Sequence, residues 1–105
     1  MEQPNQSYIN SLSGGDQAFK QKLIDVIKKE FPEEKLVYFN NYNAKNYKLA
    51  AENVHKLKHK ISILGLEKGY EVAVAYENSL LEGSTNHKEA FEAILNSITI
   101  YLEEI

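Results

Sequence analysis

Apolar residues recur at intervals of three and four positions along almost the whole chain, which is the period of an α-helix. Alternation of apolar and polar residues, the pattern of a half-buried strand, is not sustained anywhere. Only two prolines and five glycines interrupt the helical pattern, and 105 residues can bury one modest core. The sequence therefore predicts a single all-α domain over residues 1–105.

Short polar or glycine-containing segments divide this pattern. We expect helices over residues 6–12, 17–31, 32–42, 47–64, 67–82 and 87–105. Asp16 is the expected N-terminal cap of the second helix, and Asn86 with Glu89 is expected to form a capping box before the last. Pro32 suits the first turn of a new helix, in which Leu36 is expected to face the core. Four long helices joined by short loops predict an up-and-down antiparallel four-helix bundle with one or two additional short helices.

The charge and composition argue against several classes of function. The net charge is −3 and all twelve basic residues are lysines, so the chain lacks guanidinium groups for bidentate contacts to phosphates or bases. There is no cysteine, which excludes disulfides and thiolate chemistry. The first ten residues do not resemble a signal peptide, and no segment approaches the ~18 apolar residues of a membrane span. We expect a monomeric cytoplasmic protein that binds neither nucleic acid nor membranes.

The segment VHKLKHKISILGL, residues 54–66, places two of the three histidines and three lysines within six positions. On a helix over 47–64, one continuous apolar stripe must face the core, formed by Tyr47, Ala50, Val54, Leu57, Ile61 and Leu64. His55 falls on the outer face. Its neighbours there are Ala51, Lys58, His59 and Ser62. We therefore expect His55 to face solvent within a patch of small and basic residues.

This outer face is suited to group transfer. An exposed imidazole changes charge near neutral pH and is nucleophilic when unprotonated. Lys58, one turn from His55, can neutralise a phosphoryl group on that ring, and Ala51 leaves room for the backbone of another protein. Lys56 and Lys60 are expected to be solvated side chains that could steer an acidic partner. No acid, hydroxyl relay or oxyanion pocket is expected nearby, so a partner would complete the chemistry.

The segment resembles the core motif of the histidine phosphotransfer (HPt) domains of two-component phosphorelays, which has the form H-x-L-K-G followed shortly by L-G. Residues 55–59 read HKLKH, and LG follows at 64–65. The segment GGDQAFKQKLIDVIKKEFP at 14–32 is similar to the first long helix of that family. The segment AVAYENSL, which contains Glu77, is similar to the glutamate-bearing stretch in the helix after the motif. The resemblance covers nearly the whole chain, in order and in spacing.

The resemblance implies a phosphocarrier and not an enzyme, in a chain with no room for an ATP-binding domain. His55 would take a phosphoryl group on Nε2 from an aspartate of one receiver domain and pass it to another, with Lys58 contacting the phosphate. The implied partners are receiver domains of a response regulator or a hybrid histidine kinase. The receiver supplies Mg²⁺, so the chain itself would need no cofactor. The expected docking surface includes Ala51, Lys56, His59 and Ser62.

His59 departs from the family pattern, which usually has glycine at this position. Its bulk and charge beside His55 could change which receivers fit, supply a second nucleophile, or mark an HPt-like adaptor that binds a receiver or kinase without transferring phosphate. Two histidines at i, i+4 also have the spacing of zinc ligands on a helix. A third ligand would have to come from Glu52, His87 or another helix, and we do not expect a metal site.

Overall fold

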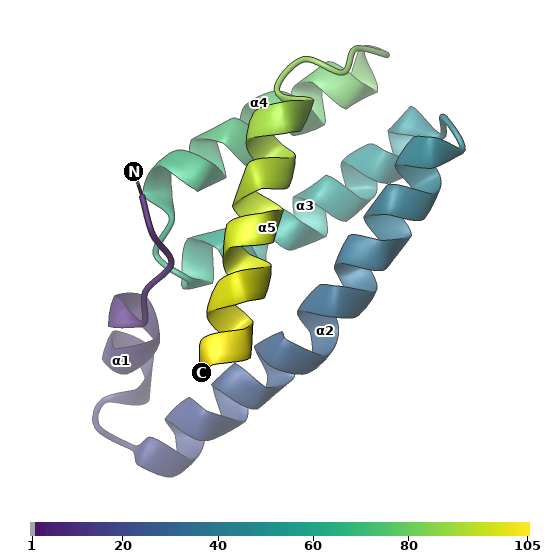
Figure 1. Cartoon of the computed structure of the whole chain (residues 1–105). Helices are drawn as coiled ribbons and strands as arrows, with labels where there is room; N and C mark the ends of the chain where they lie inside the picture. Colours follow the sequence, from purple (N-terminus) through teal and green to yellow (C-terminus); the bar gives the residue numbers. More distant parts are fainter. Residues whose placement is uncertain (1) are drawn as a thin grey trace.

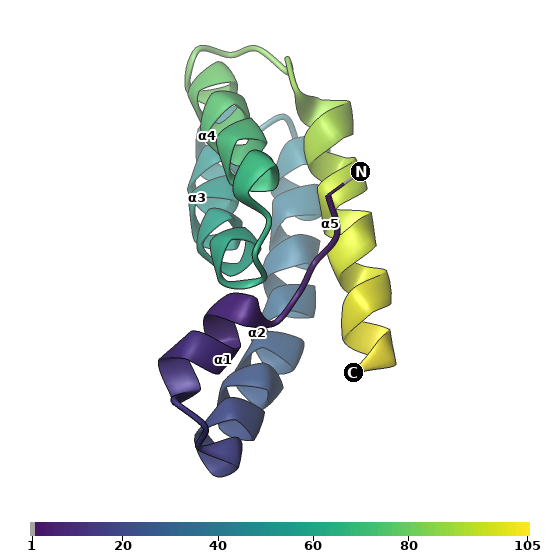
Figure 2. The same cartoon turned by 90° about the vertical axis from the view of Figure 1, so that its left-hand side faces the viewer.

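The computed structural model describes residues 2–105, and all regular structure in that range is helical. The helices are α1 (Ser7–Ser13), α2 (Gln17–Asn43), α3 (Tyr47–Ile63), α4 (Glu67–Leu81) and α5 (Lys88–Glu104). α3 packs between α2 and α4, while α5 packs against both α4 and α2 (Figure 1). The short α1 lies beside the first turns of α2 (Figure 2). The predicted all-α fold class is confirmed. Among residues 2–105, no helix combines the length and apolar character needed to cross a membrane.

The predicted helix break at Pro32 is wrong, because α2 continues through it as one helix of 27 residues. An internal proline removes one backbone hydrogen bond and costs roughly 3 kcal/mol. Phe31 and Tyr38 lie seven positions apart on the same face of α2 and are 1% and 0% exposed. Burying each aromatic side chain contributes about 1.5–3 kcal/mol, which offsets the cost of the proline.

The uninterrupted helix also changes which side chains are buried. A helix that restarts at Pro32 would direct Leu36 to the core, but Leu36 is 61% exposed and Tyr38 takes the core position instead. The reason is that α2 keeps one rotational phase from Asp16 onward, so the buried face is already set by Ile24 and Ile27. The sequence prediction failed here because it reset this phase at the proline.

The two predicted helix caps have different outcomes. The carboxylate of Asp16 accepts the backbone N–H of Phe19 at 3.1 Å, as expected for the cap of α2. The capping box predicted at 86–89 is wrong, because α5 begins at Lys88 and no side chain caps it. His87 adopts a left-handed backbone conformation with φ of 77°, which turns the chain abruptly into α5.

A buried hydrogen-bonded chain joins α2, α4 and α5. Tyr38 donates its hydroxyl to Oε2 of Glu92 at 2.9 Å, so the hydroxyl of Tyr76 donates to Tyr38 across 2.6 Å. Both tyrosines are fully buried, and Phe91 packs its ring against both, with centroid distances of 5.4 and 5.1 Å. This cluster fixes the three helices to one another.

The tyrosine pair predicts a loss of stability at alkaline pH. Burial raises the pKa of Tyr76 to about 12 and also raises the pKa of Tyr38 above its ordinary value. The stability gained from the neutral tyrosines is complete below the unfolded pKa of about 10 and is lost as the pH rises through about 12. For Tyr76 alone the loss amounts to roughly 2–3 kcal/mol.

Urea unfolding followed by circular dichroism between about pH 8 and pH 11.5 would measure this effect. The double variant Tyr38→Phe, Tyr76→Phe is expected to lose stability less steeply over the same range. Equal slopes in the wild type and the double variant would show that other groups, such as the lysines, govern the alkaline transition.

The segment before α1, residues 2–6, crosses the loop between α3 and α4, and we call it the N-terminal strap (Figure 2). The carboxylate of Glu2 accepts two backbone N–H groups in the first turn of α4, both at 2.9 Å. The backbone N–H of Asn5 donates to the carbonyl of Leu64, at the end of α3, across 2.8 Å. The strap therefore satisfies backbone groups at the end of one helix and the start of the next.

Replacing Glu2 with glutamine is expected to remove a pH-dependent contribution to stability. Partial burial raises the pKa of Glu2, but the hydrogen bonds from Lys68 and Gly69 outweigh it, so the net pKa lies below its ordinary value. The contribution is therefore present above the unfolded pKa and is lost as the pH falls through the folded value. Glu2→Gln should lower the free energy of unfolding by about 1 kcal/mol at neutral pH.

Urea unfolding at about pH 7 and pH 3 measures the difference between the variant and the wild type. The difference should shrink at the lower pH, and the exposed Gln3→Ala serves as the matched control. A deficit of the same size at both pH values would contradict a role for the ionised carboxylate.

Candidate functional site

α3 presents one face to the core and the opposite face to solvent. The predicted apolar stripe is confirmed, since five of its side chains are 0% exposed: Ala50, Val54, Leu57, Ile61 and Leu64. His55 lies on the outer side of this helix, and its side chain is 51% exposed. Because Val54 and Leu57 are fixed in the core, packing holds the backbone that carries His55.

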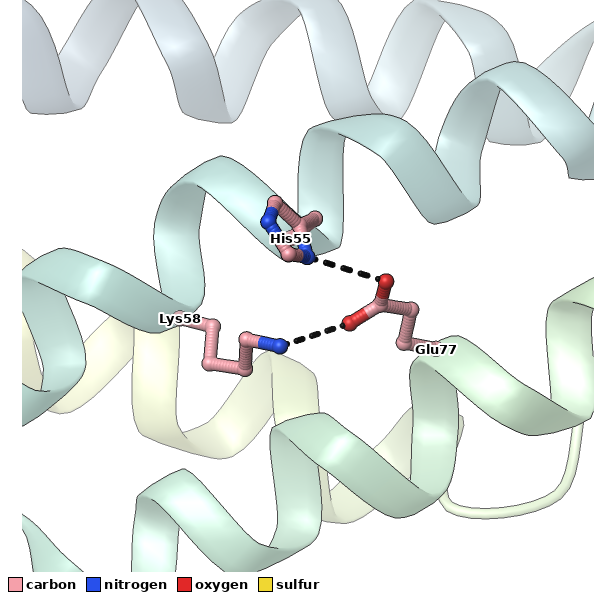
Figure 3. Close-up of polar contacts among 3 residues, drawn as sticks. All are labelled: His55, Lys58 and Glu77. Atoms are coloured by element: carbon pink, nitrogen blue, oxygen red, sulfur yellow. Dashed lines mark hydrogen bonds and ion pairs between the residues drawn. The ribbon is translucent and has the colours of Figure 1, made fainter.

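A carboxylate on the neighbouring helix holds the His55 ring. Nδ1 of His55 lies 3.1 Å from Oε2 of Glu77 on α4 (Figure 3). The second oxygen of Glu77, Oε1, accepts a hydrogen bond from Nζ of Lys58 at 3.0 Å. Glu77 and Lys58 are largely shielded, with side chains 19% and 11% exposed. One carboxylate therefore joins an exposed imidazole to a shielded ammonium group.

This contact selects the tautomer of His55. An ionised carboxylate can only accept hydrogen bonds, so the proton must lie on Nδ1. In the neutral ring the lone pair then lies on Nε2, the nitrogen not bonded to Glu77. When Nε2 forms a bond to an electrophile, the ring gains positive charge, and the Glu77 carboxylate is placed to balance it. The contact with Glu77 thus leaves Nε2 as the ring nitrogen that can bond to an electrophile.

Lys58 lies on the side of α3 that faces α4. Besides its ion pair with Glu77, its Nζ lies 5.7 Å from the centroid of the Tyr70 ring. These contacts place the ammonium group one helical turn from His55, with its charge already balanced by a carboxylate. The predicted contact between Lys58 and a phosphoryl group remains a prediction, and it requires Lys58 to share its amine between Glu77 and the phosphate.

The expectation that no acid lies near His55 is wrong, because Glu77 contacts it directly. The sequence contained a usable signal. Ala73, Tyr76 and Leu80 are buried on one face of α4, and Glu77 follows Tyr76 and lies one turn after Ala73. A helical projection of α4 therefore puts Glu77 at the edge of the core face. The projection does not show how α4 is placed and rotated relative to α3, and the packed structure supplies this information.

The residues predicted to surround His55 divide into exposed and buried ones. Lys56, His59 and Ser62 are exposed, as a docking surface requires. The expected outward position of Ala51 is wrong, since it is only 2% exposed and belongs to the buried face toward α4. It still borders an open hollow of about 310 Å³ beside the imidazole. The other residues that line this hollow are Glu52, His55, Lys56, Glu77 and Leu81.

Lys60 is not a freely solvated side chain, contrary to the prediction. Its Nζ lies 3.0 Å from Oε1 of Glu30 and 3.1 Å from Oε1 of Glu34, both on α2, and its side chain is 11% exposed. Glu30 and Glu34 are one helical turn apart on the face of α2 next to α3, so both carboxylates can contact the Lys60 ammonium group. Lys60 therefore connects α3 to α2 and takes no part in the surface around His55.

His59 follows His55 by one helical turn and is exposed. The two rings meet edge to face, with centroids 5.0 Å apart and planes inclined by 78°. No group of three histidine, cysteine or carboxylate side chains within residues 2–105 is arranged to hold a metal ion. The histidine pair therefore has no third ligand among the described side chains.

Comparison with protein-family models, curated proteins and solved structures gave no match to this chain. The functional assignment therefore depends on the geometry around His55 and on the sequence resemblance.

Proposed function

We propose that this protein is a histidine phosphotransfer domain, which relays a phosphoryl group between receiver-domain aspartates through His55. One observation carries the proposal: an exposed imidazole whose Nδ1 is bonded to Glu77, which in turn is bonded to Lys58. The arrangement leaves Nε2 as the accessible nucleophile and supplies a counter-charge for the product. It needs no metal or cofactor held by this chain.

The helix arrangement supports the same assignment. We propose that α2 to α5 form an up-and-down antiparallel four-helix bundle, with α1 as an additional short helix. Contacts join α2 to α3, α3 to α4, α4 to α5 and α5 back to α2, so each long helix packs against two others. The loops between successive long helices are short, which favours antiparallel neighbours.

The proposed reaction is a direct displacement at phosphorus. The Nε2 lone pair of His55 attacks the phosphorus of an aspartyl phosphate, the N–P bond forms, and the acyl P–O bond breaks. The bonding electrons leave with the receiver carboxylate. The proton on Nδ1 stays in place, so the phosphorylated ring is cationic and its hydrogen bond to Glu77 becomes charge-assisted. Attack by a second receiver aspartate reverses these steps and frees His55.

A partner must provide what this site lacks. Within residues 2–105, the hydrogen bonds at this site join His55 and Lys58 to Glu77, and the nearby cation that could meet a phosphoryl dianion is the Lys58 ammonium group. We propose that a receiver domain supplies Mg²⁺ and the acidic pocket when it docks over the exposed part of the α3–α4 surface. The exposed residues expected to meet it include Lys56, His59 and Ser62. The proposed location is the cytoplasm, where receiver domains act.

The test is phosphate uptake from phosphoramidate, a small donor that requires no partner. Intact mass should rise by one phosphoryl group, and peptide mapping at neutral pH should locate an acid-labile phosphate on His55. A folded protein that takes up no phosphate would contradict the proposal and favour a non-transferring adaptor. The adaptor would still bind a receiver domain, which calorimetry against a panel of receivers can detect.

A further inference from the structure

His59 lies on the side of His55 from which a phosphoryl group would project. His55 and His59 are four positions apart, so their side chains are offset by about 40° around the axis of α3. Lys58 lies on the opposite side of His55 from His59 and points toward α4. His59 therefore lies beyond His55 as seen from α4. Because Nδ1 of His55 faces Glu77 on α4, its Nε2 edge is turned away from that helix. The ring of His59 lies 5.0 Å from that of His55, so it is a close neighbour on this side.

The charged groups that face this part of α3 from the neighbouring helices already have partners. From α4, Glu77 faces His55 and Lys58, and Tyr70 lies under Lys58. From α2, Glu30 and Glu34 are paired with Lys60. On α3 itself, Lys56 lies three positions before His59, on the same side of the helix, and Glu52 lies seven positions before it. Both side chains are exposed, and both line the hollow beside His55.

His59 has no hydrogen bond or ion pair of its own within residues 2–105. A phosphoryl dianion on His55 would be the closest anion available to its ring. Both ring nitrogens of His59 can carry protons and donate, as an imidazolium does.

We propose that His59 is a proton-dependent ligand of the phosphoryl group on His55, which makes the lifetime of the phosphorylated form depend on pH. This inference rests on the proposed phosphotransfer at His55. Histidine side chains change charge between pH 5 and 8. A protonated ring attracts the phosphoryl dianion, and loss of the phosphoryl group spreads and reduces that charge in the transition state. Protonation of His59 therefore slows the loss of phosphate.

The experiment compares three proteins phosphorylated with phosphoramidate and freed of donor: the wild type, His59→Gln and His59→Lys. Intact mass follows the loss of phosphate between about pH 5.5 and 8.5. The N–P bond of phosphohistidine is itself acid-labile, so the readout is the ratio of each lifetime to that of His59→Gln at the same pH. Glutamine and lysine both favour helices, and circular dichroism checks that each variant is folded.

The wild-type ratio should be about two- to fivefold at the lowest pH, as for an exposed ion pair, and should fall to one at the highest. His59→Lys carries a fixed cation, so its ratio should stay above one across the range. His87→Gln, which removes the remote histidine, should behave as the wild type does.

A wild-type ratio that does not change with pH would overturn the inference, and so would a phosphate mapped to His59 itself. Phosphate on His55 with a flat ratio would remove only the role of His59 and leave the proposed function standing. No phosphate on either histidine would remove both proposals together.

Discussion

The variant His55→Gln is expected to take up no acid-labile phosphate from phosphoramidate while keeping the helical content of the wild type. Glutamine has no nucleophilic ring nitrogen, so the N–P bond cannot form. The fold should tolerate the change because the His55 side chain is 51% exposed and the core side of α3 is untouched. Intact mass measures the phosphate, and far-ultraviolet circular dichroism measures the helices.

Two matched variants make this result specific. His59→Gln changes the neighbouring histidine and should still be phosphorylated, as should His87→Gln in the loop before α5. Phosphate taken up by His55→Gln at the wild-type rate would place the acceptor elsewhere. Phosphate lost only in His59→Gln would identify His59 as the acceptor.

Replacing Glu77 with glutamine is expected to slow phosphorylation of His55 by roughly 10- to 100-fold. The wild-type carboxylate fixes the proton on Nδ1 and balances the positive charge that the ring gains in the reaction. A hydrogen bond to a charged group contributes about 1.5–3 kcal/mol, which corresponds to that range of rates. The amide of glutamine is neutral and can present either a donor or an acceptor to the ring. The initial rate of mass gain with phosphoramidate measures the effect.

The matched control is Glu71→Gln, which removes an exposed carboxylate from the same helix without touching the His55 ring. It should leave the initial rate close to that of the wild type. Glu77→Gln also frees Lys58, so circular dichroism and urea unfolding must show that the α3–α4 pair remains folded. If a folded Glu77→Gln protein is phosphorylated within about twofold of the wild-type rate, the carboxylate does not assist the chemistry.

The sequence predicts the site best where one helix determines it. The stripe from Ala50 to Leu64 fixes the rotation of α3, and this rotation alone is enough to expose His55 and bury Leu57. Ala51 lies at the margin of that stripe, and the single-helix projection assigned it to the wrong side. Its burial depends on how closely α4 approaches, which no property of α3 specifies.

Features that depend on two helices were harder to predict. Glu77 reaches His55 across 22 positions of sequence, and their contact depends on the register between α3 and α4. Lys60 binds Glu30 and Glu34 for the same kind of reason, through the packing of α2 on α3. Pro32 favours the start of a helix, but α2 continues through it because the aromatic side chains on either side of it are buried. Tertiary packing outweighed local propensity at each of these places.

The N-terminal strap has a practical consequence for work with this protein. Glu2 accepts hydrogen bonds from the start of α4, and Asn5 donates one to the end of α3, so the strap is attached directly to the two helices that carry His55 and Glu77. A tag, fluorophore or surface anchor attached before residue 2 would therefore exert force on the helix pair that carries His55 and Glu77. Ile105 follows α5, a helix that contributes no atom to the hydrogen bonds that join His55, Glu77 and Lys58. Reporters and immobilisation handles are therefore best joined at that end.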